Sequence, residues 1–156
     1  MDKDNYCFGC GTENPNGLHL VVEEAVPGEV WAACVVPRHL QGYHRIVHGG
    51  ILATLLDEIM AHAAFRCVTG PVATARMEIT FRSPVRVEEP IRVEGRIESV
   101  RGKLVRTRGR LITQDGQTAA EASATFFRLP DHAGGEGLGT RDSRLEARDS
   151  GFEADS

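Results

Sequence analysis

One helical pattern dominates this sequence and limits how the rest of the chain can fold. From Gly50 onward, apolar residues recur three and four positions apart and occupy a broad face. These residues are Ile51, Leu52, Leu55, Leu56, Ile59, Met60, Ala63 and Ala64. Their spacing predicts a helix of about 18 residues that ends near Thr69, Gly70 and Pro71. We expect this helix to be buried on most sides.

Six strand patterns surround the helical one. They lie at 18–24, 29–36, 74–82, 91–100, 104–113 and 118–129. Pro27-Gly28, Arg101-Gly102 and Asp115-Gly116 are typical of the short turns that join such strands. Because short connections favour antiparallel pairing, the sequence predicts an α+β fold in which a curved antiparallel sheet wraps around one long central helix.

The composition indicates one domain with a sizeable core. The chain has 156 residues, of which 41% are hydrophobic and 26% charged, and these are ordinary values for a globular protein. Residues 1–17 are rich in turn formers, so we expect an irregular lead-in before a domain at 18–130. Residues 131–156 carry the whole net charge of −4 and few bulky apolar side chains, which favours a disordered acidic tail.

Several classes of protein are not expected from this sequence. The apolar helix is too short to cross a bilayer, and Asp57, Glu58 and His62 interrupt it. The N-terminal residues do not form a basic-then-apolar signal peptide, which favours a cytoplasmic protein with reduced cysteines. Cys7 and Cys10 form a Cys-x-x-Cys pair, but no second pair completes the usual four ligands of structural zinc, so we expect no metal.

Basic residues are frequent between positions 82 and 110, a range that contains nine lysines and arginines and only four glutamates. One interpretation is alternating charge on the solvated face of a sheet, and the other is a positive surface for a phosphate-bearing ligand. Nucleic acid is not the expected ligand, because neither a DNA- or RNA-binding motif nor interleaved aromatic residues accompany the arginines.

Two carboxylates, Asp57 and Glu58, stand in the middle of the apolar helix. An ionised carboxylate in a core without partners is costly, so Asp57 needs a role, and we predict a catalytic one. Its neighbours one turn away include Ala53 and Ala61, whose small side chains leave room for a ligand. Glu58 instead aligns with His62 in a polar stripe, which favours a hydrogen-bonded structural residue.

His48, Gly49 and Gly50 stand where the helix is predicted to begin. The free N–H groups of a helix N-terminus favour negative charge, and glycine lets a ligand approach them closely. An oxyanion site and a carboxylate are the two parts that acyl transfer requires. Gly49 and Asp57 are separated by roughly 12 Å along a helix, too far for both to contact one carbonyl group. We therefore predict a two-fold homodimer in which each site combines the amide of one subunit with the carboxylate of the other.

The run HGGILATLLDE at 48–58, followed by TARMEITFRSPV at 74–85, resembles the hotdog-fold acyl-CoA thioesterases of the phenylacetic-acid-degradation (PaaI-like) type. The resemblance covers 5–130, and CFGCGTENPNGLHL at 7–20 looks like a subgroup of that family. It implies a hotdog fold and hydrolysis of an acyl- or aryl-CoA to the free acid and CoA. It also implies that neither a metal nor a redox cofactor takes part, and that the chain forms a homodimer or a dimer of dimers.

The resemblance implies roles for individual residues. Asp57 matches the carboxylate that attacks the thioester or activates water, and the choice between these roles stays open. The backbone N–H of Gly49, helped by that of Gly50, matches the group that polarises the thioester carbonyl. His48 matches the histidine that fixes this turn. Thr74 matches a hydroxyl residue that positions the attacking water, and a plain strand-edge threonine is the alternative.

One position departs from the family pattern. Many relatives carry an Asn shortly before the histidine, whereas this chain has Gly42 with Gln41 beside it, and Gln41 is the candidate substitute. The candidate substrate-binding residues are Gln41, Ala53, Glu58 and Ala61. The resemblance also gives the basic residues at 82–110 a candidate role in binding the nucleotide of CoA.

Two other functions remain open at this stage. One is a non-catalytic module that binds acyl-CoA. The other is a hotdog hydratase or dehydratase, although the differently placed Asp and His pair of those enzymes is not found in this sequence.

Overall fold

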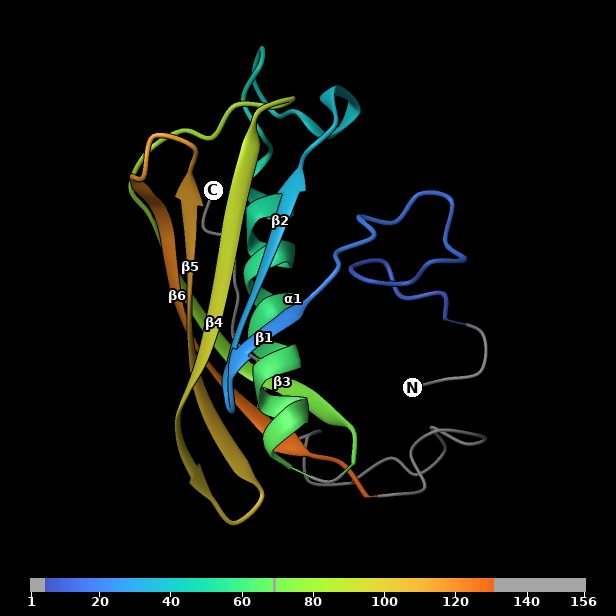
Figure 1. Ribbon diagram of the computed structural model, residues 1–156, viewed down its shortest axis with the longest axis vertical. Helices are drawn as coiled ribbons and strands as arrows, with labels where there is room; N and C mark the ends of the chain where they lie inside the picture. Colours follow the sequence, from blue (N-terminus) through green and yellow to red (C-terminus); the bar gives the residue numbers. More distant parts are fainter. Residues whose placement is uncertain (1–4, 69, 131–156) are drawn as a thin grey trace, which may run out of the picture.

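A long helix lies against a six-stranded antiparallel sheet in the computed structural model, which describes residues 5–68 and 70–130 (Figure 1). The elements are β1 (Glu23–Val26), β2 (Glu29–Val35), the 3-10 helix η1 (Arg38–Leu40), α1 (Gly49–Cys67), β3 (Val72–Phe81), β4 (Pro90–Arg101), β5 (Leu104–Thr113) and β6 (Thr118–Arg128). The spatial order of the strands is β1-β2-β4-β5-β6-β3, so β1 and β3 are the edges of the sheet. The predicted α+β fold is confirmed.

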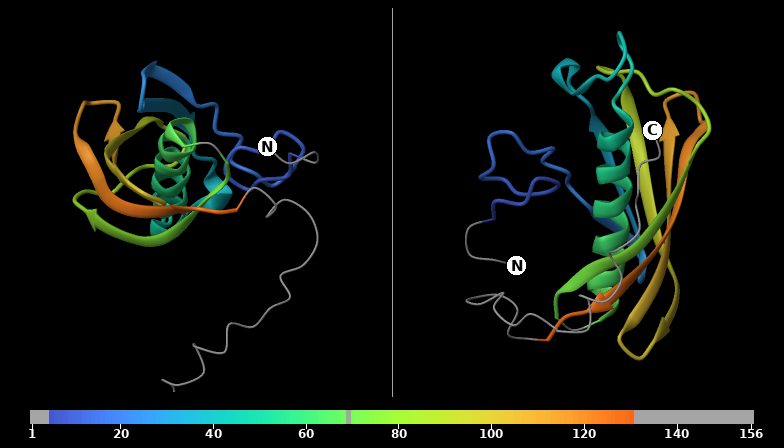
Figure 2. Two further views of the ribbon diagram at one scale, coloured as in Figure 1. Left: turned by 90° about the horizontal axis from the view of Figure 1, so that it is seen from below. Right: turned by 180° about the vertical axis from the view of Figure 1, so that it is seen from behind.

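Helix α1 is the predicted apolar helix, and its buried face forms the centre of the core. Its buried side chains are Leu52, Leu55, Leu56, Ile59, Met60, Ala63 and Ala64. The sheet curves around this face (Figure 2). The other side of the helix, with Ala53, Asp57 and Ala61, is only half-buried. Burial on most sides is therefore not achieved by one chain, because the sheet covers one face of the helix and leaves the opposite one open.

Two paired glycines allow α1 to approach the sheet closely. Gly95 on β4 lies opposite Gly109 on β5. A Cβ atom on Gly95 would lie 2.8 Å from the backbone oxygen of Ile59, and one on Gly109 would lie 3.0 Å from Cγ of Met60. No larger residue fits at Gly95 without moving the helix backbone, so this contact fixes the position of α1 on the sheet.

The strand patterns after the helix are confirmed to within two residues, and that at 104–113 matches β5 at both ends. The turns between the strands are also where the sequence predicts them. Gly28 and Gly116 have φ values of 83° and 82°, a conformation that glycine adopts without strain.

The first predicted strand is wrong in its extent. We expected a strand at 18–24, but β1 comprises only Glu23–Val26. The residues before it pair with the lead-in instead, since the N–H of Leu20 donates to the carbonyl oxygen of Gly9 at 2.9 Å. Residues 5–17, hereafter the N-terminal segment, form turns beside α1 (Figure 2).

The predicted disordered tail at 131–156 lies outside the described residues. Among the residues that are described, none of the helices has both the length and the hydropathy needed to cross a membrane.

Candidate active site

Asp57 and Thr74 meet where the middle of α1 lies beside the beginning of β3. The Oγ1 hydroxyl of Thr74 donates a hydrogen bond to Oδ1 of Asp57 at 2.8 Å. Asp57 is half-buried and Thr74 is exposed, so the pair can be reached from the open side of α1. The contact adds a role that the sequence did not suggest, in which the Thr74 hydroxyl orients the carboxylate of Asp57. That Thr74 positions the attacking water stays a prediction.

The N-terminus of α1 is capped by His48. The backbone of His48 is extended, and its Nδ1 accepts a hydrogen bond of 2.9 Å from the N–H of Gly50. The histidine thus satisfies one of the free donors of the helix terminus. Because the Gly50 amide is engaged in this way, it does not point to a ligand. The N–H of Gly49 has no acceptor among the described residues, so Gly49 alone is the amide that a developing oxyanion can use.

Asp57 and Gly49, the two halves of the candidate site, lie beside opposite ends of β3. Asp57 bonds to Thr74 at the start of β3, whereas Gly49 lies near Phe81, the last residue of β3. A Cβ atom on Gly49 would be 3.8 Å from Cζ of Phe81. Gly49 and Asp57 are both within α1, so they are roughly 12 Å apart along its axis. The structure of one chain does not bring them together.

The other candidate substrate-binding residues surround the open side of α1 and its N-terminus. Ala53 and Ala61 are half-buried, one turn before and after Asp57. The Oε1 oxygen of Gln41 accepts a hydrogen bond of 3.0 Å from the backbone N–H of Arg45, so Gln41 supports the loop that leads into the helix. Substrate contact by these residues stays a prediction.

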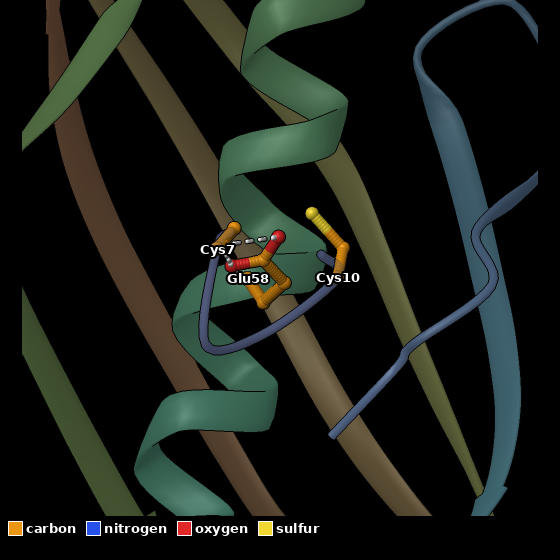
Figure 3. A group of neighbouring side chains, drawn as sticks. All are labelled: Cys7, Cys10 and Glu58. Atoms are coloured by element: carbon orange, nitrogen blue, oxygen red, sulfur yellow. Dashed lines mark hydrogen bonds between the residues drawn. The ribbon is translucent and has the colours of Figure 1, made fainter. Parts of the chain in front are cut away.

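Glu58 points into the N-terminal segment, where it lies beside Cys7 and Cys10 (Figure 3). Its Oε1 lies 3.2 Å from Nε2 of His62, and the Cys7 thiol lies 3.7 Å from Oε2. Burial alone would raise the pKa of Glu58, but hydrogen bonds from His62, Cys10 and Cys7 outweigh it and hold the pKa below its usual value. Burial is also the main cause that raises the pKa of the Cys10 thiol, and Glu58 adds to it.

Cys7, Cys10 and Glu58 are the described residues that could hold a metal ion. One ligand atom from each lies within 4.8 Å of the others. Sequence reasoning did not combine them, because Glu58 is more than 45 positions away from the Cys-x-x-Cys pair. The glycines between and directly after the two cysteines were the feature of the sequence that could have indicated a tight turn around a ligand.

Many of the basic residues at 82–110 are paired on the outer face of the sheet. Their ion pairs are Arg82–Glu121, Arg92–Glu94, Arg108–Glu98 and Arg110–Glu94. The guanidinium of Arg92 also stacks 4.2 Å above the ring of Trp31. A hollow of about 670 Å³ lies over this face, and neither Asp57 nor Thr74 lines it. These pairs favour the interpretation of alternating charge on a solvated sheet.

The motif region matches known proteins. A sequence model of the thioesterase superfamily matches residues 44–120. Acyl-coenzyme A thioesterase THEM4 of Rattus norvegicus is 30% identical over 95 residues, which are 60% of this chain and 40% of that protein. The chain thus aligns with well under half of this longer relative.

Solved structures agree with the fold. One thioesterase superfamily protein has a TM-score of 0.73 and 28% identity, and the likeness covers 79% of this chain and 60% of that one. The PaaI protein of the E. coli phenylacetic acid degradation operon has a TM-score of 0.67 and 17% identity, with 73% and 82% covered. Together with the helix wrapped by its sheet, these findings show that the chain has the hotdog fold and that its residues 44–120 match the thioesterase superfamily.

Proposed function

We propose that this protein is an acyl-CoA thioesterase, which hydrolyses an acyl- or aryl-CoA thioester to the free acid and CoA. The observation that carries the proposal is the Asp57 carboxylate held by Thr74 at one end of β3, with the unpaired amide of Gly49 at the other end. These are the base or nucleophile and the oxyanion donor that acyl transfer requires. Similarity to a curated acyl-coenzyme A thioesterase supports CoA as the leaving group.

Asp57 can start the reaction in two ways. As a general base, it accepts a proton from water while the water oxygen bonds to the thioester carbon. As a nucleophile, its own oxygen bonds to that carbon and forms an anhydride, which water then hydrolyses. In both routes the carbonyl oxygen becomes negative beside the N–H of Gly49, the C–S bond breaks, and the thiolate of CoA takes up a proton. The overall reaction is a hydrolysis without change of oxidation state, so we propose no redox cofactor.

We propose that the complete site forms between two chains that pair through β3. As an edge strand of ten residues, β3 presents unpaired N–H and C=O groups that a second copy can bind. In an antiparallel two-fold pairing centred between Met77 and Glu78, Thr74 of one chain lies opposite Phe81 of the other. This register places Asp57 of one chain near Gly49 of its partner. It also covers the half-buried side of α1.

We therefore propose that the working protein is a homodimer or a dimer of dimers. We also propose that it is located in the cytoplasm. All four cysteines, Cys7, Cys10, Cys34 and Cys67, are free thiols, as is usual in a reducing compartment. Sedimentation velocity of the purified chain measures the oligomeric state. A monomer at the concentrations used in activity assays contradicts the composite site.

The function is tested by following free thiol during incubation with a panel of short, medium-length and aryl acyl-CoAs. Asp57→Asn and Asp57→Ala should lower kcat by about 100-fold or more, as expected when a general base or nucleophile is lost. Asp115→Asn is the matched control, because Asp115 lies in the turn between β5 and β6. Unchanged kcat in a folded Asp57 variant excludes its catalytic role. Tight binding of acyl-CoA without any turnover favours a binding module instead.

A further inference from the structure

The Cys-x-x-Cys turn of the N-terminal segment encloses a carboxylate that comes from the helix. The Cys7 thiol lies 3.7 Å from Oε2 and 3.9 Å from Oε1 of Glu58. Cys10 belongs to the same group, whose ligand atoms all lie within 4.8 Å of one another. Two ligands bound to one tetrahedral zinc ion, a sulfur at 2.3 Å and an oxygen near 2.1 Å, lie about 3.6 Å apart. The observed separation of sulfur and oxygen therefore matches one edge of a zinc coordination shell.

Two glycines shape the turn around this carboxylate. A Cβ atom on Gly9, between the cysteines, would lie 2.3 Å from Oε2 of Glu58. A Cβ atom on Gly11 would lie 2.4 Å from the backbone nitrogen of Cys7, and the N–H of Gly11 closes the turn on the carbonyl oxygen of Cys7 at 2.9 Å. The close fit means that the turn and Glu58 form one packed unit rather than a chance encounter on the surface.

His62 holds the carboxylate from the helix side. Its Nε2 lies 3.2 Å from Oε1 of Glu58, one helical turn away, and the side chains of His62 and Glu58 are 15% and 17% exposed. A residue that orients a ligating carboxylate in this way is typical of the outer shell of metal sites. The other partners of Glu58 are thiols, which are weak hydrogen-bond donors.

We propose that Cys7, Cys10 and Glu58 bind a Zn²⁺ ion, and that this ion links the N-terminal segment to α1. Two thiolates and a carboxylate are ligands that zinc accepts, and binding replaces the two thiol protons, which pass to the solvent. The three residues supply three of four tetrahedral positions, and water fills the fourth on the exposed side of Cys7. The sequence alone led to an expectation of no metal because a second cysteine pair is missing; the helix provides the third ligand instead.

The test uses the full chain, reduced and stripped with a chelator, in competition with a coloured zinc indicator. The wild-type protein should bind about one Zn²⁺ per chain. Cys10→Ser and Glu58→Gln should weaken binding by more than about 100-fold, beyond the usual effect of an outer-shell change. His62→Gln should weaken it by about 10- to 100-fold. Cys67→Ser, which removes an exposed thiol outside the group, should bind like the wild type.

Co²⁺ gives a second readout that does not depend on activity. The wild-type protein with Co²⁺ should show a thiolate-to-metal absorption band and the intense visible bands of tetrahedral cobalt, and Cys7→Ser should reduce the thiolate band. Circular dichroism identifies a variant that fails to fold, and Glu58→Gln then decides the question because it keeps both thiols. The proposal is overturned if the reduced wild-type chain leaves Zn²⁺ with the indicator, or if Cys10→Ser and Glu58→Gln bind as the wild type does.

Discussion

The hydroxyl of Thr74 donates a hydrogen bond to Oδ1 of Asp57 across the contact between β3 and α1. The bond engages one oxygen of the carboxylate and leaves the other for water or substrate. Thr74 thus orients the group that starts the proposed reaction. It acts through Asp57, so we regard it as a positioning residue.

Thr74→Ala should lower kcat about tenfold, which corresponds to one hydrogen bond to a charged group. KM should change less, because the hydroxyl bonds to Asp57. Thr74→Ser keeps the donor and should restore most of kcat. Thr125→Ala, on β6, is the control that should behave like the wild type. Steady-state kinetics with the best acyl-CoA measure these values, and equal kcat for the Ala and wild-type proteins excludes the positioning role.

Gly49→Pro should abolish most hydrolysis without breaking the helix. Gly49 is the first residue of α1 after its cap, a position where proline is tolerated, and the extended backbone of His48 suits a following proline. Proline removes the N–H that is proposed to hold the oxyanion, and the loss of one such donor typically costs about 100-fold in kcat. Gly49→Ala keeps the N–H and meets only an ordinary contact with Phe81, so it is the matched control.

Mixing two inactive variants tests whether each site is shared between chains. In a hybrid of Asp57→Asn and Gly49→Pro chains, one site carries both changes and the other carries neither. After unfolding and refolding of an equal mixture, about one quarter of the wild-type activity should return. Sites built within one chain predict no recovery, because every chain in the mixture is defective.

His48→Ala should destabilise the protein by about 1 kcal/mol, since it removes the cap on the N–H of Gly50. His48→Asn replaces the ring by another good capping residue and should restore part of the stability. His39→Ala, at an exposed position in η1, serves as the control. Urea denaturation at neutral pH measures the differences. Equal midpoints for all four proteins show that the cap contributes nothing.

Glu94 should make stability depend on pH in the acid range. Burial raises its pKa, but hydrogen bonds from Arg110 and Arg92 outweigh burial and hold the pKa below the ordinary value of 4.5. Its stabilising effect is therefore complete well above pH 4.5 and is lost as the pH falls through the lowered pKa. Both arginines are half-exposed, so we expect Glu94→Gln to cost less than about 1 kcal/mol at pH 7.

The difference between wild type and Glu94→Gln should shrink when urea denaturation is repeated at progressively lower pH. Glu23→Gln is the control, because Glu23 is exposed on β1. A difference that grows on acidification contradicts the assignment.

The helix, five of the six strands and the turns follow from local patterns in the sequence. The apolar spacing of α1 and the glycine turns are determined within a few neighbouring residues, so a single sequence contains the information. The stretch at 18–24 has the same alternation as a strand, but the N-terminal segment offers Leu20 another hydrogen-bond partner. A competing partner distant in the sequence cannot be read from the pattern of the strand itself.

The candidate site, like the fold, was predictable from the sequence only in part. Asp57 is conspicuous because a carboxylate interrupts an apolar helix. Its contact with Thr74 was not predicted, because the family resemblance suggested only that Thr74 positions the attacking water. The occupation of the Gly50 amide by His48 depends on a side-chain rotamer, which the sequence does not contain. Glu58 and Cys7 are brought together by the folding of the N-terminal segment over α1, which no local spacing predicts.

The length of β3 limits where this protein can accept insertions and deletions. Thr74 and Phe81 are separated by about 23 Å of extended chain, and in the proposed pairing this distance separates the two reaction centres of the dimer. A deletion of two residues between them would preserve which side chains face the core. It would also shift the two chains relative to each other and misalign both reaction centres. Insertions and deletions are therefore more readily tolerated in the turns at the far edge of the sheet than within this strand.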